Sequence, residues 1–213
     1  MNVRITQRIP QSKQTPHRRF LRWSRDLFLV AGVIILGYCA FTLLDAKLYQ
    51  AHQARRFQRQ LSSVQPATPG DSGLHPLLIA PPLGGALGSI EINRIGLTAM
   101  IMEGIDGRTL RRAVGHIPGT PLPGQQGNVA IAGHRDSFFR PLRNIRHDDE
   151  ITLTTLAGSY RYSVDSTQVV EPEDTQVLDD SGGAILTLVT CYPFYFVGPA
   201  PKRFVVRAHK IPG

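Results

Sequence analysis

Three side chains suited to acyl-transfer chemistry stand beside apolar segments of this chain. Cys191 closes the apolar run 184–190, and Arg203 heads a second apolar run twelve positions later. His134 ends another apolar segment, 128–133. A thiolate attacks carbonyl carbon, an imidazole moves protons, and a guanidinium stabilises an oxyanion. The combination predicts a thiol acyl-transfer enzyme with Cys191, His134 and Arg203 as catalytic residues.

Each of these residues also has an ordinary structural explanation. A cysteine that follows an apolar run is more often a small buried residue than a nucleophile. A lone histidine in a loop is usually only solvated, and His116 is a rival to His134 for the acid–base role. No two histidines show metal-ligand spacing with Cys191, so we expect no zinc site. We also assign no calcium site to the acidic residues of 170–177, and we expect no cofactor.

The positive charge of the chain lies in its N-terminal part. The formal net charge is +8, but residues 1–60 hold eleven Lys and Arg against Asp26 and Asp45, which leaves residues 61–213 close to neutral. A nucleic-acid-binding domain carries its basic residues on the folded surface. We therefore expect no nucleic-acid partner.

Residues 27–44 form an uncharged apolar stretch that follows a basic arm, residues 1–26. As a helix they reach about 27 Å, close to the thickness of the hydrocarbon core of a bilayer. The basic arm places the N-terminus in the cytoplasm by the positive-inside rule. A cleaved signal peptide ends in small residues, which Asp45-Ala46-Lys47 does not provide. The sequence predicts a single-pass protein of the cell membrane with an extracytoplasmic domain.

Residues 45–88 are expected to connect the membrane span to that domain. Residues 46–61 hold four basic residues without Pro or Gly and predict a helix, whose basic face suits anionic lipid or solvent equally well. Residues 65–88 are rich in Pro and Gly, which is typical of a linker. Cys39 lies in the span and cannot pair with Cys191, which is therefore either an inert or a reactive thiol.

Residues 89–213 are expected to form one compact, mainly β domain. Short apolar stretches separated by turn residues predict seven or eight strands in a closed or nearly closed barrel. A short helix is expected over Thr109–Val114, with Asp106 before it. The expected strands are Ile90–Ile95, Ala99–Glu103, Val129–Ala132, Glu150–Thr155, Tyr160–Val169, Ile185–Thr190 and Phe204–Ala208.

Several motifs resemble those of the sortase family, the extracytoplasmic cysteine transpeptidases of bacteria. Residues 187–191, Thr-Leu-Val-Thr-Cys, match the T-L-x-T-C signature of the family, with His134 and Arg203 at its other catalytic positions. The segments 115–120, 133–139 and 191–194 are most similar to class D sortases.

The resemblance implies an eight-stranded sortase barrel with short helices. It also implies cleavage of an LPXTG-like motif near the C-terminus of a secreted protein, through a Cys191 thioester. His134 is then the acid and base, Arg203 stabilises the oxyanion, and the acceptor is an amine of a peptidoglycan precursor or another protein. By the same analogy Thr190 and Tyr192 contact substrate, although the Thr190 hydroxyl could equally cap its strand.

Two other functions are compatible with the same residues. A thiol peptidase or thioesterase would use Cys191, His134 and Arg203 but would resolve the thioester with water. A membrane-tethered binding module would carry an inert Cys191. The ratio of transfer to hydrolysis, and the labelling of the thiol, discriminate between these alternatives.

Overall fold

The computed structural model describes residues 16–63, 80–179, 182–196 and 198–212. The chain divides into two compact units, Met1–Leu44 and Asp45–Gly213. Helix α1 (Pro16–Ser63) contains, within the described residues, one stretch long and apolar enough to cross a membrane, judged by length and composition. None of that stretch is buried by the residues that the structure describes. Residues 1–15 of the expected basic arm and residues 65–79 of the expected linker lie outside the described residues.

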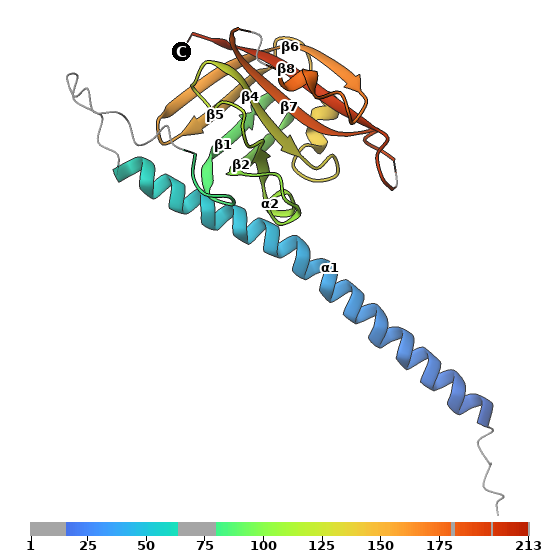
Figure 1. The fold of residues 1–213 in the computed structure, drawn as a ribbon. Coiled ribbons are helices and arrows are strands. Elements are labelled where there is room, and N and C mark those ends of the chain that lie inside the picture. The colour runs from blue at the N-terminus through green and yellow to red at the C-terminus, as the bar shows by residue number, and fades with distance from the viewer. Residues whose placement is uncertain (1–15, 64–79, 180–181, 197, 213) are drawn as a thin grey trace, which may run out of the picture. The chain divides into compact units, whose positions relative to one another are not determined.

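The second unit contains a closed barrel of eight strands, in the order β1-β2-β3-β4-β7-β8-β6-β5 (Figure 1). The antiparallel pairing of β1 with β5 closes the barrel, and only β2–β3 and β4–β7 are parallel pairs. This architecture confirms the predicted barrel. The strands are β1 (Ala86–Ile92), β2 (Leu97–Glu103), β3 (Val114–His116), β4 (Gly127–Gly133), β5 (Glu150–Thr155), β6 (Gly158–Val170), β7 (Ala184–Tyr192) and β8 (Lys202–Ile211).

Alternating side chains fill the barrel. In β5, Ile151, Leu153 and Thr155 are buried while the residues between them reach the surface, because neighbouring residues of a strand point to opposite faces. Buried apolar side chains from each of the eight strands meet in one interior cluster, which also holds Phe139 and Leu142 from the connection after β4. That connection includes the short 3₁₀ helix η3 (Arg140–Asn144).

The stretch between β2 and β4 differs from the sequence prediction. The helix α2 runs from Gly107 to Arg112, capped by Asp106, and Val114 belongs to β3 instead. Strand β3 was not predicted, since three residues are too few to show an alternating pattern. Strand β1 starts at Ala86, within the expected linker, and Ile95 lies in the 3₁₀ helix η2 (Asn93–Ile95).

The last part of α1 packs on the outside of the barrel. Phe57 is buried against Met100, Met102 and Ala113, and the side chains of Tyr49, Ala54 and Leu61 border the same cluster. Gln50 adds two hydrogen bonds, one from its amide to the Arg112 carbonyl (2.5 Å) and one from the Met100 N–H (2.9 Å). The helix that the sequence predicts over 46–61 therefore has an apolar face buried on the barrel as well as a basic face.

Candidate active site

Cys191 and Arg203 lie directly opposite each other on neighbouring strands. In the antiparallel pair of β7 and β8, Cys191 is the register partner of Arg203. Paired residues share a face of the sheet, with Cβ atoms roughly 4.5–5.5 Å apart. The thiol is part-buried and unbridged. Among the described residues, Arg203 donates from Nη1 to the carbonyls of Ala200 (3.4 Å) and Lys202 (3.1 Å).

His134 lies at the same end of the neighbouring parallel strand. Gly133, the last residue of β4, is the register partner of Thr190 in β7. His134 directly follows Gly133, and Cys191 directly follows Thr190. Adjacent strands run about 4.8 Å apart, so the register brings the backbones of His134 and Cys191 close together. His134 is half-buried.

The loop after β4 is held in a tight turn. The His134 carbonyl accepts hydrogen bonds from the N–H groups of Phe139 (3.1 Å) and Ser137 (3.4 Å). The ring of the buried Phe139 lies so close to Gly133 that a Cβ there would meet it at 2.7 Å. A larger residue at position 133 would displace Phe139 and with it the turn that carries His134.

Thr190 and Tyr192 lie on the face of β7 opposite Cys191, because successive side chains alternate. The buried Thr190 hydroxyl donates to the Gly133 carbonyl at 2.7 Å and so fastens β7 to β4. The Tyr192 ring stacks on Phe204, with centroids 6.3 Å apart. The structure does not bring these two side chains to the thiol, and their contact with substrate stays a prediction.

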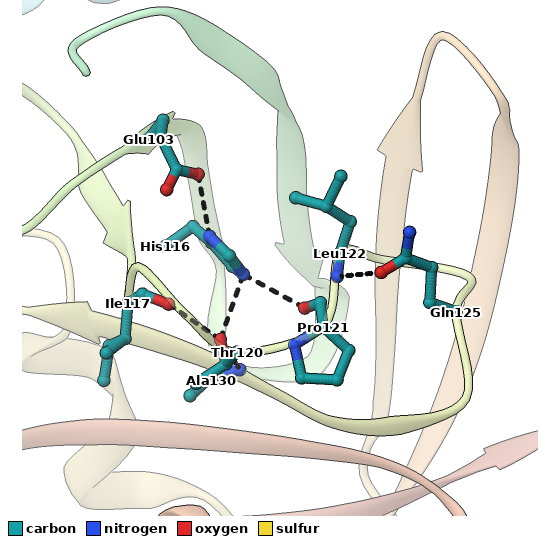
Figure 2. Close-up of polar contacts among 8 residues, drawn as sticks. All are labelled: Glu103, His116, Ile117, Thr120, Pro121, Leu122, Gln125 and Ala130. Carbon is teal, nitrogen blue, oxygen red and sulfur yellow. Dashed lines mark hydrogen bonds and ion pairs between the residues drawn. The ribbon is translucent and has the colours of Figure 1, made fainter. Parts of the chain in front are cut away.

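The rival His116 is buried and fully engaged (Figure 2). Its Nδ1 lies 2.7 Å from the carboxylate of Glu103, and its Nε2 lies 3.0 Å from both the Pro121 carbonyl and the Thr120 hydroxyl. The Pro121 carbonyl can only accept, so Nε2 carries a proton and donates it. The contact between Nδ1 and Glu103 needs a second proton, which lies either on the ring, as an imidazolium with a carboxylate, or on Glu103, as a neutral ring with a carboxylic acid. His116 therefore has no ring nitrogen left for acid–base work at the surface.

Comparisons with known proteins agree with this geometry. The sortase domain matches residues 90–211, which cover the barrel. The chain belongs to the sortase family. It is a sortase-type cysteine transpeptidase. It is 31% identical over 193 residues to Sortase D of Bacillus subtilis, covering 87% of this chain and 96% of that protein.

Solved sortase structures share the fold. The Sortase D5 transpeptidase of Clostridium perfringens has 27% identity and a TM-score of 0.58, over 78% of this chain and 98% of the other. Sortase C-1 of Actinomyces oris has 26% identity and a TM-score of 0.57, over 76% and 98%. The predicted similarity to class D sortases is thereby confirmed.

Arg135 joins the two loops of this sortase that carry His134 and Cys191. Its guanidinium donates from Nη1 to the Pro193 carbonyl (3.0 Å) and from Nη2 to the carbonyls of Phe196 and Gly198 (both 2.8 Å). It also lies over the Phe196 ring, 5.8 Å from the centroid. Sequence reasoning passed over Arg135 because its partners are backbone carbonyls, which leave no pattern of residue types.

Asn128 was also missed by sequence reasoning. Its amide donates to the carbonyls of Val177 (3.0 Å) and Asp179 (3.2 Å), and its oxygen accepts from the Thr187 hydroxyl (2.7 Å). These bonds fix the connection between β6 and β7, which contains the 3₁₀ helix η4 (Thr175–Leu178), against the strands that lead to His134 and Cys191. Within the described residues, no group of three or more His, Cys, Asp or Glu side chains could hold a metal ion.

Proposed function

We propose that this sortase cleaves an LPXTG-like motif through a thioester on Cys191 and transfers the acyl group to an amine. The observation that carries the proposal is the register of three neighbouring strands, in which Cys191 is paired with Arg203 and His134 follows the partner of Thr190. Acyl transfer needs a nucleophile, a group that moves protons and a group that stabilises the oxyanion. These three residues, at the same end of neighbouring barrel strands, have the side chains for those roles.

In the first half-reaction the thiolate of Cys191 attacks the carbonyl carbon of the Thr–Gly bond in the motif. A C–S bond forms, and the carbonyl oxygen takes the negative charge. Arg203 is paired with Cys191, and its bonds to the carbonyls of Ala200 and Lys202 use Nη1, so donors on Nε and Nη2 can stabilise this oxygen. The C–N bond then breaks, and His134 gives its proton to the departing glycine amine.

In the second half-reaction an amine attacks the thioester carbonyl. His134 takes the proton from the incoming amine, the C–S bond breaks, and the thiolate returns. An amide replaces the original amide, so no oxidant or cofactor is consumed. The acceptor is an amine on a peptidoglycan precursor or on another protein.

We further propose that residues 27–44 anchor the enzyme in the cell membrane with its N-terminus in the cytoplasm. The support is the uncharged length of this stretch, its lack of burial, and the basic residues before it. The barrel and its active site then lie outside, where secreted substrates pass.

The experiment compares transfer with hydrolysis. The full chain in detergent micelles is incubated with an LPXTG-type peptide, with and without an amine, and mass spectrometry follows the products. The proposal predicts an amide product that requires the amine, that is lost in Cys191→Ala and that is retained in the matched variant Cys39→Ala. Release of only the free acid at every amine concentration would instead support a thiol hydrolase, and no reaction would support a binding module.

A further inference from the structure

A basic cavity lies beside the start of the second unit, apart from the active site. Its volume is about 740 Å³, and its walls come from Tyr49 of α1, the turn at Leu83–Gly84, Met102 of β2 and the helix α2. Three arginines in five positions, Arg108, Arg111 and Arg112, line it. The catalytic candidates lie on β4, β7 and β8, so the proposed reaction does not use this cavity.

The acidic groups of the cavity region already have partners. The Asp45 carboxylate accepts from Arg112 Nε at 3.0 Å, and the Arg112 guanidinium also lies over the Tyr49 ring, 5.1 Å from its centroid. Asp106 accepts from the Thr109 hydroxyl (2.6 Å) and from the N–H groups of Arg108 and Thr109. These hydrogen bonds lower the pKa of Asp106, and the bond from the Thr109 hydroxyl has the largest effect. Asp106 therefore stays ionised as the cap of α2.

The described residues do not neutralise the charge of Arg108 and Arg111. Both are exposed, and neither forms an ion pair with an acidic side chain in the part of the chain that the structure describes. Nη1 of Arg111 lies 3.4 Å from the place that a Cβ on Gly107 would take, so this guanidinium lies over the first turn of α2, at the cavity wall. Two guanidinium groups beside a cavity suit an anion with several oxygen atoms, above all a phosphate.

The position of the cavity along the chain indicates which phosphate it meets. Asp45 directly follows Leu44, the last residue of the apolar stretch, and Tyr49 follows four residues later. Four helical residues advance about 6 Å, and the headgroup layer on each side of a bilayer is roughly 5–7 Å thick. If residues 27–44 span the bilayer, the residues that directly follow them in the chain, 45–49, meet the headgroup layer, and Arg112 is bonded to Asp45. Tyrosine is also enriched at this level of membrane proteins.

We propose that this cavity binds the phosphate of an anionic phospholipid headgroup, through Arg108 and Arg111. This inference rests on the membrane anchor proposed above. The apolar surfaces of Leu83 and Met102 line the same cavity and suit the glycerol and upper acyl carbons of a lipid better than they suit free phosphate. Binding here would tie the barrel to the outer leaflet at a second point besides the anchor.

The test counts lipids bound to the full chain. Native mass spectrometry measures how much phosphatidylglycerol or phosphatidylcholine remains on the protein after release from detergent micelles doped with each lipid. The test variant is Arg108→Gln with Arg111→Gln. The matched control is Arg55→Gln with Arg59→Gln, which removes the same charge from exposed positions of α1.

The proposal predicts that the wild type and the control retain phosphatidylglycerol in preference to phosphatidylcholine. The test variant should bind phosphatidylglycerol at least roughly thirty-fold more weakly, since it loses two guanidinium groups that donate charge-assisted hydrogen bonds to the phosphate. Cys191→Ala should bind it like the wild type, which separates this proposal from the proposed chemistry.

Three results would overturn the proposal. Equal losses in both double variants would indicate general surface attraction. Equal retention of the two lipids would exclude recognition of an anionic headgroup. Displacement of phosphatidylglycerol by inorganic phosphate at comparable concentration would assign the cavity to a soluble phosphate compound. Unchanged peptide transfer by the test variant shows that it is folded.

Discussion

At the scale of single residues, the candidate active site contains side chains that hold loops as well as the side chains proposed to react. Arg135 adjoins His134 in the chain and spans to three carbonyls of the loop that follows Cys191. A guanidinium can do this because its donors fan out in a plane, whereas an ammonium donates from a single point. We therefore infer that Arg135 is a positioning residue, which holds the loop that carries His134 against the loop that follows Cys191.

Replacement of Arg135 should slow catalysis without unfolding the barrel. We expect Arg135→Ala to lower kcat/KM on the order of a hundredfold, since a displacement near 1 Å of a reacting group can cost that much, and Arg135→Lys to recover only part of it. Steady-state kinetics checks this, with thermal unfolding to show retained fold. The matched variant Arg140→Ala, in the same connection, should keep its activity. Equal activity of Arg135→Ala and wild type would exclude the positioning role.

The buried pair of Glu103 and His116 should matter for stability. Glu103→Ala leaves Nδ1 of the buried His116 ring without its partner, at a cost of about 1–3 kcal/mol of unfolding free energy. Glu103→Gln should be milder, because its amide can donate to Nδ1 of a neutral ring. Thermal unfolding measures both.

The exposed pair of Asp165 and His209 provides the control for this prediction. Asp165→Ala should change the melting temperature little, since exposed ion pairs contribute weakly. A drop for Glu103→Ala no larger than that for Asp165→Ala would contradict the role of the buried pair.

At this scale the sequence shows which residue types can react but not which of them are accessible. The apolar runs that precede Cys191 and His134 predict positions at strand ends, and both are found there. His116 ends a strand as well, yet its partner Glu103 lies thirteen positions away on β2, and no local pattern reveals that contact.

At the scale of elements, the last part of α1 belongs to the second unit. Its apolar face is spaced for a helix and packs on the outward side chains of β2. The basic residues of this segment are plain in the sequence. The apolar side chains are widely separated along the chain, and their packing on Met100 and Met102 is seen only in the folded structure. The segment is part of the folded barrel unit rather than a spacer.

Phe57→Ala tests this packing. Removal of a buried aromatic ring should lower the unfolding free energy by about 3–5 kcal/mol and expose the outer face of β2. Hydrogen exchange of β2 amides measures the exposure, with Arg56→Ala as the exposed neighbour that should change nothing. Unchanged exchange in Phe57→Ala would show that the helix does not pack there in solution.

The ion pair between Arg94 and Asp149 links two further elements, and its contribution to stability depends on pH. Arg94 in η2 donates to both oxygens of Asp149, just before β5, and the Arg146 N–H donates to the same carboxylate at 2.7 Å. The bonds from Arg94 lower the pKa of Asp149. Because the folded pKa lies below the unfolded value near 3.9, the stabilisation is present above that value and is lost as pH falls through the folded pKa.

Arg94→Gln should therefore lower the melting temperature at neutral pH and flatten its fall below about pH 4. Thermal unfolding across this range measures the effect. Arg161→Gln breaks the more exposed pair with Glu150, and it should change the melting temperature and its pH dependence in the same direction but by less. Parallel curves for Arg94→Gln and the wild type would contradict the link.

At the scale of the whole molecule, the closed barrel brings together segments that are far apart in the chain. The strand pattern predicts seven or eight strands, and it locates the ones that carry Cys191, His134 and Arg203. It does not specify that β4 pairs in parallel with β7, since parallel pairing depends on which strands meet and leaves no local signature. That pairing brings the backbone of His134 close to the backbone of Cys191.

The central claim is that Cys191 forms a thioester with the acyl part of the substrate. The most direct measurement incubates the full chain with an LPXTG-type peptide without amine and records the intact mass. The account predicts a gain equal to the peptide up to its Thr, less the two hydrogens and one oxygen of water, mapped to Cys191 and released by hydroxylamine. Turnover of the peptide with the adduct on another residue, or with Cys191→Ala still active, would contradict it.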